Sequence, residues 1–174
     1  MKKLATLAIL FVFTLSLLNA KNLPLGSSAP TINISEWLTE APDGDNPFQG
    51  KTVVLEFWAT WCGPCVKAIP HLNSLVDKYQ SDDLIFVSIT KENKSKVTSF
   101  MKKKEMKAYV ALDDKGKTNS AYRIRAIPKA YIISPEGKII WDGHPFNLSD
   151  QLLDYYLEHK EMPKNTSAPT RKKK

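Results

Sequence analysis

The feature that most constrains the fold is an apolar run that ends just before a pair of cysteines. Residues Thr52–Trp58 are mostly apolar and rich in β-branched side chains, a composition that favours a strand buried on both faces. The only two cysteines of the sequence follow in Trp61-Cys62-Gly63-Pro64-Cys65. At a helix start, unpaired N–H groups and the helix dipole favour an anion at the first thiol, and the second lies one turn later. The sequence therefore predicts a strand that leads into a dithiol suited to thiol–disulfide exchange.

The first 20 residues have the layout of a secretory signal peptide. Met1-Lys2-Lys3 is positively charged, Leu4–Leu18 is an apolar stretch of 15 residues, and Ala20 stands at a plausible cleavage point. The stretch is short for a membrane span, which needs about 20 residues. No cysteine follows it, which excludes a bacterial lipid anchor there. We expect export to the periplasm or another extracytoplasmic space. The alternative is an uncleaved membrane anchor, because Leu18 is a poor residue three positions before the cut.

The positive charge of the chain is concentrated near its two ends. The net charge is +7, of which residues 1–20 carry +2 and residues 160–174 carry +5. The segment between them is neutral, and no basic patch interleaved with aromatic residues argues for nucleic-acid binding. Residues 160–174 are rich in Pro, Ser, Thr and Lys, which predicts a disordered basic tail. We therefore expect a signal peptide at 1–20, one domain at 21–159 and a tail at 160–174.

Between residues 31 and 159, short apolar runs alternate with helical patterns. Strands are expected at 31–34, 52–59, 84–90, 109–112, 130–134 and 138–141, and helices or helical turns at 35–38, 62–80, 95–104, 119–122 and 148–159. Pro135-Glu136-Gly137 marks a hairpin turn, and Pro70 is expected to kink the helix that contains it. This order predicts an α/β domain with a central mixed sheet and helices on both faces.

The stretch from Val53 to Cys65, with Pro70 five residues later, closely resembles thioredoxin-fold proteins. Gly26-x-x-Ala29-Pro30, the export signal and an extra segment around residues 91–112 resemble the TlpA/ResA branch of these proteins. Members of that branch are extracytoplasmic thiol–disulfide oxidoreductases. The resemblance spans about residues 26–158. It implies a thioredoxin-like fold with an extra N-terminal segment and a central insertion.

The resemblance also assigns roles to the residues of the cysteine motif. It implies that Cys62 is the exposed nucleophile that attacks a partner disulfide, and that Cys65 resolves the mixed disulfide. In such motifs the pKa of the first cysteine falls from about 8.5 to about 3.5–7.5. Trp61, Gly63 and Pro64 would contact the substrate. The alternative role for Trp61 is to cover the start of the helix.

Glu56 is an acid within the apolar run, on the opposite strand face from its two neighbours. Burial of a carboxylate is costly, so its pKa should lie well above about 4.3. It stands six residues before Cys62, where thioredoxins carry a buried Asp, and by that resemblance it would exchange protons with Cys65. ResA-like members instead carry an acid three residues after the second cysteine, where this chain has Ala68. We therefore expect Glu56 to be the catalytic acid; a surface or ion-paired Glu is the alternative.

Ile127-Pro128 precedes the strand expected at 130–134, where the thioredoxin fold places a cis-proline facing the cysteines. From the residues alone, Pro128 is an ordinary strand-start proline, since only about 5–6% of X–Pro bonds are cis. The resemblance implies a cis bond that turns the backbone of Ile127 outward, to pair with the extended chain of a substrate. Lys129 stands where threonine is common in the family.

Other sites that use paired cysteines fit the sequence less well. Zinc would need two more Cys or His ligands, and the only histidines are His71, His144 and His159. A c-type haem would need a His directly after the second cysteine, where Val66 stands. A Cu(I) carrier would use the two cysteines and His144, but exported copper chaperones of this fold space their cysteines more widely. We expect no metal and no cofactor, with copper transport and an inert disulfide as lesser alternatives.

The expected direction of electron flow rests on the resemblance to thioredoxin. The Gly63-Pro64 dipeptide and an apolar residue before Pro128 suggest a potential near about −270 mV, against about −120 mV for DsbA. We therefore expect a monomeric exported reductase of disulfide-bearing proteins, such as apocytochrome c thiols. A membrane donor of the DsbD or CcdA type would recharge it. A disulfide oxidase or isomerase is the main alternative.

Overall fold

A six-stranded mixed sheet runs through the part of the chain that the computed structural model describes, residues 23–163. Its strands are β1 (Ile34–Trp37), β2 (Thr52–Phe57), β3 (Leu84–Thr90), β4 (Tyr109–Asp113), β5 (Lys129–Ile133) and β6 (Ile139–Gly143). Their order across the sheet is β1-β4-β3-β2-β5-β6. Strands β2, β3 and β4 are parallel, whereas β1, β5 and β6 are antiparallel to the strands they pair with. The predicted mixed sheet is confirmed.

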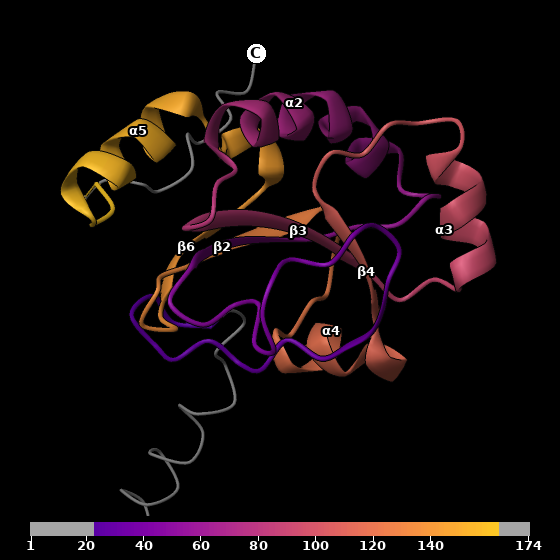
Figure 1. Cartoon of the computed structure of the whole chain (residues 1–174), viewed down its shortest axis with the longest axis horizontal. Helices are drawn as coiled ribbons and strands as arrows, with labels where there is room; N and C mark the ends of the chain where they lie inside the picture. Colours follow the sequence, from indigo (N-terminus) through magenta and orange to yellow (C-terminus); the bar gives the residue numbers. More distant parts are fainter. Residues whose placement is uncertain (1–22, 164–174) are drawn as a thin grey trace, which may run out of the picture.

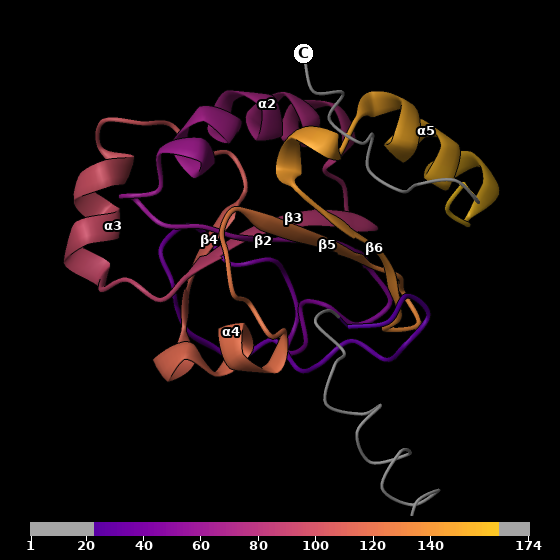
Figure 2. The same cartoon turned by 180° about the vertical axis from the view of Figure 1, so that it is seen from behind.

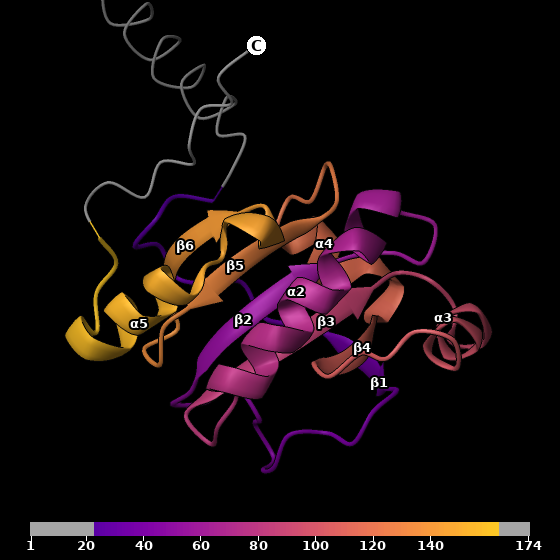
Figure 3. The same cartoon turned by 90° about the horizontal axis from the view of Figure 1, so that it is seen from above.

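Helices cover both faces of this sheet (Figures 1 and 2). Helices α2 (Gly63–Tyr79) and α5 (Asp150–His159) lie on one face, and α4 (Lys117–Ala121) lies on the other. Helix α3 (Lys94–Met101) lies beyond the β4 side of the sheet, and the view from above shows α2 lying across its middle (Figure 3). Two short 3-10 turns, η2 (Asp114–Gly116) and η3 (Pro145–Asn147), complete the list. The predicted α/β arrangement with helices on both faces is therefore confirmed.

The pleat of β2 divides the core into two layers, and every residue of this strand is buried. Val54 faces α2 and α5 and packs with Leu72 and Leu153 from those helices. Leu55 and Phe57 face the opposite side, in a layer that contains Tyr122 and Tyr131. Burial of each large apolar side chain contributes about 1.5–3 kcal/mol, so β2 is the strand that both layers share.

The N-terminal segment crosses the face opposite α2, bonds to β6 on one side of the sheet and forms the outermost strand, β1, on the other. At one edge Gly26 N donates to Ile139 O at 2.7 Å, and Ile139 N donates to Ser27 O at 2.9 Å. At the other edge β1 pairs with β4 in the antiparallel direction. The rings of Trp37 and Phe48, with their centres 6.2 Å apart, pack against the core layer that contains Leu55 and Phe57. The extra segment therefore pairs backbone groups of β4 and β6 that would otherwise lie at the edges of the sheet.

The central insertion at residues 91–112 supplies α3 and most of β4. Val97 on α3 is fully buried, and Phe100 and Met101 pack beside it against the cluster that holds both cysteines. Helix α3 starts after Asn93, whose Oδ1 accepts from Lys96 N at 3.0 Å. The insertion therefore contributes packing to the region around the cysteines.

The local assignment of residues 31–38 is wrong. The strand was expected at 31–34 and a helical turn at 35–38, but the strand covers Ile34–Trp37. Pairing with β4 and contact between Trp37 and Tyr109 rings, 6.2 Å apart, decide this segment. Elsewhere, α2 continues through Pro70 as one helix, with Pro70 on its exposed side.

The expected signal peptide at 1–20 and residues 164–174 of the expected tail lie outside the described residues. Across residues 23–163, the helices are all too short or too polar to cross a bilayer.

Asp113 joins the end of β4 to α4. Its Oδ1 accepts from Thr118 N at 2.8 Å, and its Oδ2 accepts from the backbone N (2.9 Å) and Nδ2 (2.8 Å) of Asn119. Gly116, with φ +75°, makes the left-handed turn that brings these donors back to the carboxylate. These bonds hold the start of the segment that leads to β5.

We expect Asp113→Ala to lower the free energy of unfolding by about 2–4 kcal/mol, because three buried donors lose their acceptor. Urea unfolding followed by circular dichroism measures this loss. Asp114→Ala is the matched control, since Asp114 is partly exposed and forms a surface ion pair with Lys117. An equal loss in both variants would contradict a special role for Asp113.

Candidate active site

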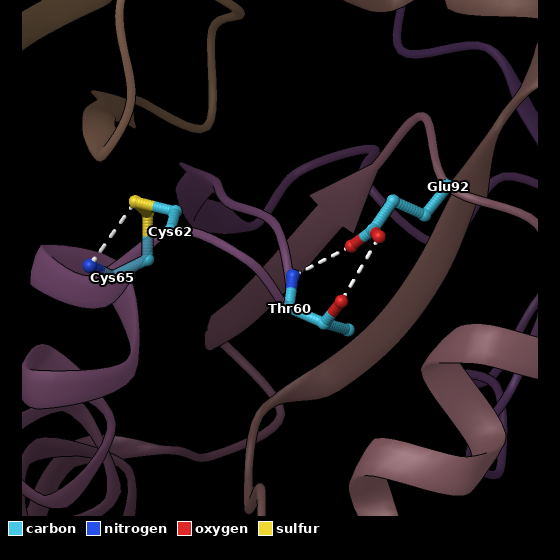
Figure 4. Close-up of a disulfide and its surroundings, with 4 residues drawn as sticks. All are labelled: Thr60, Cys62, Cys65 and Glu92. Carbon is cyan, nitrogen blue, oxygen red and sulfur yellow. Dashed lines mark hydrogen bonds between the residues drawn. A yellow bond between two sulfur atoms is a disulfide. The ribbon is translucent and has the colours of Figure 1, made fainter.

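The two cysteines lie at the start of α2, directly after the central strand. Cys62 is the residue that precedes the helix, and its Sγ accepts from Cys65 N at 3.2 Å (Figure 4). Pro64 occupies the first turn, where no backbone N–H is needed. Cys62 and Cys65 form a disulfide with their Cα atoms 5.2 Å apart. The predicted strand, loop and helix arrangement is confirmed.

The exposure of the pair differs from the expectation. Cys62 was expected to be exposed, but in this disulfide-bonded form it is 4% exposed, and Cys65 is 0% exposed. Trp58 and Ala59 pack around both cysteines in the same buried cluster. Both cysteines are thus buried in the disulfide-bonded form, and Cys62 is the slightly more exposed of the two.

The start of α2 favours a negative charge on Cys62. The first turn of this helix contains no acidic residue, and Cys65 N already points at the Cys62 sulfur. Unpaired N–H groups and the helix dipole stabilise an anion at such a position. The start of α2 is therefore a site that suits an anionic sulfur.

Glu56 is buried in the sheet, and only 2% of its surface is exposed. Ser88 Oγ on β3 donates to Glu56 Oε2 at 2.7 Å, while Oε1 has no partner among the described residues. Burial raises the pKa of Glu56 to about 7, against the smaller opposing effect of the Ser88 hydrogen bond. The alternative of a surface or ion-paired Glu is therefore wrong.

Strand alternation places Glu56 on the face of β2 that α2 covers. Val54 and Trp58, two residues to either side, pack on that face with helix α2 and with the cysteines, respectively. Ala68, the position where ResA-like proteins carry an acid, is fully buried on α2. Glu56 is thus the buried acid in the β2 strand that leads to the disulfide.

The Ile127–Pro128 peptide bond is cis, as the resemblance implied. Strand β5 begins at the next residue, Lys129, which pairs with Phe57 at the end of β2. Ile127 packs against the cluster that contains Cys62 and Cys65. The fold therefore brings Pro128 to the end of the sheet where the cysteines lie.

Lys129 is turned toward its neighbouring strand. Its Nζ forms an ion pair with Asp142 on β6 and lies 5.1 Å from the centre of the Tyr131 ring. Both side chains of the ion pair are mostly buried, at 21% and 19% exposure. The departure from threonine at this position therefore serves the β5–β6 pairing.

Trp61 and Trp58 differ sharply in exposure. Trp61 is 73% exposed beside Cys62, so covering the start of α2 is not its main role. Trp58 is 3% exposed, packs on Phe100 with the ring centres 5.5 Å apart, and its Nε1 has no partner within residues 23–163. Gly63 is exposed next to Trp61, as is Pro64. The motif therefore presents an apolar surface next to the disulfide.

A contact that the sequence did not reveal holds the loop before the cysteines. Thr60 N donates to Glu92 Oε2 at 2.5 Å, and Thr60 Oγ1 donates to Glu92 Oε1 at 2.9 Å (Figure 4). Thr60 follows β2 and Glu92 follows β3, and these strands are parallel neighbours. The sequence could have indicated this contact through the two predicted strands, because the carboxyl ends of parallel strands lie at one edge of the sheet.

The histidines do not complete a metal site with the cysteines. His144 Nδ1 accepts from Phe146 N at 3.3 Å, and His71 Nε2 lies 2.7 Å from Leu148 O. Among residues 23–163, no group of three His, Cys, Asp or Glu side chains is placed to hold a metal ion. The structure does not assemble the ligand set of two cysteines and His144 that a Cu(I) carrier would use.

Comparisons with known proteins agree with this geometry. The chain is 33% identical over 109 residues to thiol-disulfide oxidoreductase ResA of Bacillus thuringiensis subsp. konkukian, covering 62% of this chain and 63% of that protein. The match therefore spans less than two thirds of the length of this relative.

Solved structures with similar folds include two named for redox proteins. A putative thiol:disulfide interchange protein DsbE from Chlorobium tepidum has a TM-score of 0.60 and 26% identity, covering 70% of this chain and 86% of that one. The thioredoxin domain of the thiol-disulfide oxidoreductase BVU-2223 from Bacteroides vulgatus has a TM-score of 0.65 and 22% identity, covering 78% and 97%. The fold is therefore thioredoxin-like.

The model of the AhpC/TSA family matches residues 28–142, which is well over half of the chain. The match includes β1 to β5, the disulfide, Glu56 and Pro128. The chain therefore belongs to the AhpC/TSA family and has a thioredoxin-like fold.

Proposed function

We propose that this protein is a thiol–disulfide oxidoreductase that reduces disulfide bonds in exported proteins. The observation that carries the proposal is the Cys62–Cys65 disulfide at the start of α2, packed beside Ile127 and its cis-Pro128. In the reduced protein, these two thiols can donate two electrons to a client by forming the Cys62–Cys65 disulfide. The names of the similar proteins, ResA and DsbE, support the same chemistry.

The reaction would proceed by two thiol–disulfide exchanges. In the reduced protein, the Cys62 thiolate attacks one sulfur of the client disulfide, forms a mixed disulfide and releases the other client sulfur as a thiolate. Cys65 then attacks Cys62 Sγ, which forms the intramolecular disulfide and releases the first client sulfur. The client gains two electrons, and the cysteine pair loses two.

Glu56 would accept the proton that the Cys65 thiol loses in the second exchange. A carboxyl with a pKa of about 7 can take up and release a proton near neutral pH. Ser88 holds one carboxylate oxygen and leaves Oε1 free of partners among the described residues. Transfer would occur directly or through a water molecule.

The client would lie as an extended strand along the surface around Cys62. The backbone of Ile127 before cis-Pro128 would pair with it, as in other strand-addition complexes. Trp61, Gly63 and Pro64 would supply apolar contact next to the reacting sulfur, in line with their exposure. A client disulfide would then reach Cys62 from the side of the helix start where Trp61 is exposed.

The compartment and the electron donor form part of the same proposal. The signal-like segment at 1–20 supports export to the periplasm or another extracytoplasmic space. In such an oxidising space a reductase must be recharged, which suggests a membrane donor of the DsbD or CcdA type. Apocytochrome c thiols are an expected client, and the protein would act as a monomer.

We expect the Cys62/Cys65 pair to have a reduction potential near about −270 mV, the value of thioredoxin. Equilibration with dithiothreitol buffers, followed by thiol trapping, measures it. A potential near about −120 mV would contradict the reductase proposal and favour disulfide formation. Absence of any reversible couple would contradict redox chemistry at this pair and leave an inert disulfide as the explanation.

Replacing Cys65 by Ser should stop the reaction at the mixed disulfide. We expect Cys65→Ser to form covalent complexes with disulfide-bearing exported proteins, visible as bands that dithiothreitol removes. Cys62→Ser is the matched control and should form none, since it lacks the attacking thiol. Complexes in the control at equal yield would contradict the assignment of Cys62 as nucleophile.

Glu56→Gln should remove a pH dependence of stability. The pKa of Glu56 is raised from 4.5 to about 7, so its ionisation opposes folding progressively as the pH rises from about 4.5 to about 7. At pH 8 we expect the variant to be more stable than the parent by about 3 kcal/mol, and the difference to vanish below about pH 4.

Urea unfolding of the oxidised protein at pH 4 and pH 8 checks this difference. In the same variant, resolution of the mixed disulfide should slow by about 10²-fold, the loss typical of a general base. Ser88→Ala is the companion variant, because it removes the hydrogen bond and leaves the carboxyl. A parent and Glu56→Gln difference that is the same at both pH values would contradict the raised pKa.

A further inference from the structure

A pocket of about 320 Å³ lies beside the cysteine motif. Three loops at one end of the sheet form it: the loop after β2, the loop after β3 and the segment before β5. Trp58 and Trp61 line it from the first loop, and Ile124 and Ile127 line it from the third. The pocket therefore presents apolar walls next to the reacting disulfide.

Two positively charged residues also line this pocket. Lys91 and Arg125 are exposed, and neither has an ion-pair partner within residues 23–163. The Lys91 side chain runs past Gly116, where an added Cβ would lie 3.3 Å from Lys91 Cδ. Its methylene chain therefore lies close to Gly116 at the end of η2, and the residue as a whole is exposed.

The acidic residue at the pocket does not cancel these charges. Both Glu92 oxygens accept hydrogen bonds from Thr60, one from the backbone N and one from Oγ1. Lys91 and Arg125 against Glu92 leave a net positive charge among the lining residues. A partner that enters the pocket with a negative charge therefore gains attraction, and one with a positive charge meets repulsion.

The pocket lies on the path that a client is proposed to take. Ile127 lines the pocket and is also the residue whose backbone would pair with the client chain. A residue close to the client cysteine would therefore stand over the pocket when that cysteine meets Cys62. Alternate side chains of an extended chain point to the same face, so one can enter while its neighbour reaches the rim.

We propose that this pocket selects the clients of the enzyme. It takes an apolar side chain that flanks the client cysteine, and Lys91 and Arg125 recognise an acidic side chain beside it. This inference rests on the proposed function, because it specifies the client class of the same site. The occupant is an extended polypeptide with an apolar and an acidic residue next to its disulfide.

The test uses a set of disulfide-linked peptides that share one sequence and have Leu next to the cysteine. The following position carries Glu, Gln or Lys, and a fourth peptide has Gly in place of Leu beside Glu. The reduced protein is mixed with each peptide, and the second-order rate constant of its oxidation is measured from tryptophan fluorescence at low and high salt.

We expect the Glu peptide to react about 3- to 10-fold faster than the Lys peptide at low salt, with the Gln peptide between them. High salt should shrink this ratio, because the charges lie at the surface. In Lys91→Glu/Arg125→Glu the order should reverse. The Gly peptide should react more slowly than the Leu peptide, since it leaves the apolar pocket empty.

The matched control is Lys103→Glu/Lys138→Glu, which changes the net charge equally at two exposed lysines outside the pocket. It should keep the order of the parent. Equal rates for Glu and Lys peptides in the parent, or the same reversal in the control, would overturn the charge recognition. Equal rates for the Leu and Gly peptides would overturn the apolar subsite. If the Gln peptide is not reduced at all by the parent, the proposed function itself is wrong.

Discussion

Burial of strand β2 on both faces is the constraint on which the rest of this structure depends. Because neither face of β2 meets water, helices and loops must cover the sheet from above and below. The chain therefore comes to the surface only beyond the ends of this strand. Its carboxyl end leads through a short loop into α2. The first cysteine therefore lies at the start of this helix and also at the edge of the core. The position of the disulfide thus follows from how the central strand is packed.

The same burial makes Glu56 both costly and useful. Because this carboxyl is buried, with Ser88 as its one hydrogen-bond partner within residues 23–163, it keeps its proton to higher pH than a carboxyl in water. An apolar residue there would stabilise the strand better near neutral pH. The protein instead holds an ionisable group on the face of β2 that α2 covers. In the proposed mechanism, this loss of stability is offset by the use of Glu56 as a proton acceptor.

Loops from different parts of the chain meet at the end of the sheet that carries the cysteines. Thr60 and Glu92 join the loops after two parallel strands, while cis-Pro128 arrives from the opposite direction on an antiparallel strand. Together they surround the disulfide with a surface that is apolar at its centre and positively charged at one side. The reacting sulfur atoms are common to many proteins of this fold, so the surrounding loops are where recognition of particular clients can differ.

Much of the fold and part of the site could be predicted from the sequence, because they depend on local patterns. The apolar period of β2, the helical period of α2 and the strand face of Glu56 follow from spacing along the chain. The cis form of Pro128 was expected only by resemblance, since its residues alone favour an ordinary proline. Residues 35–37 belong to a strand rather than to the predicted helical turn at 35–38, because β4, more than 70 residues later, supplies their pairing. The burial of Cys62, the Thr60–Glu92 contact and the Lys129–Asp142 pair likewise required the tertiary structure, because each depends on atoms brought together from distant strands.

The sequence by itself thus determined the strand, the helix and the cysteine pair, through periodicity and local chemistry. Only the packed chain decided which loops surround the disulfide, since long-range pairing sets that arrangement.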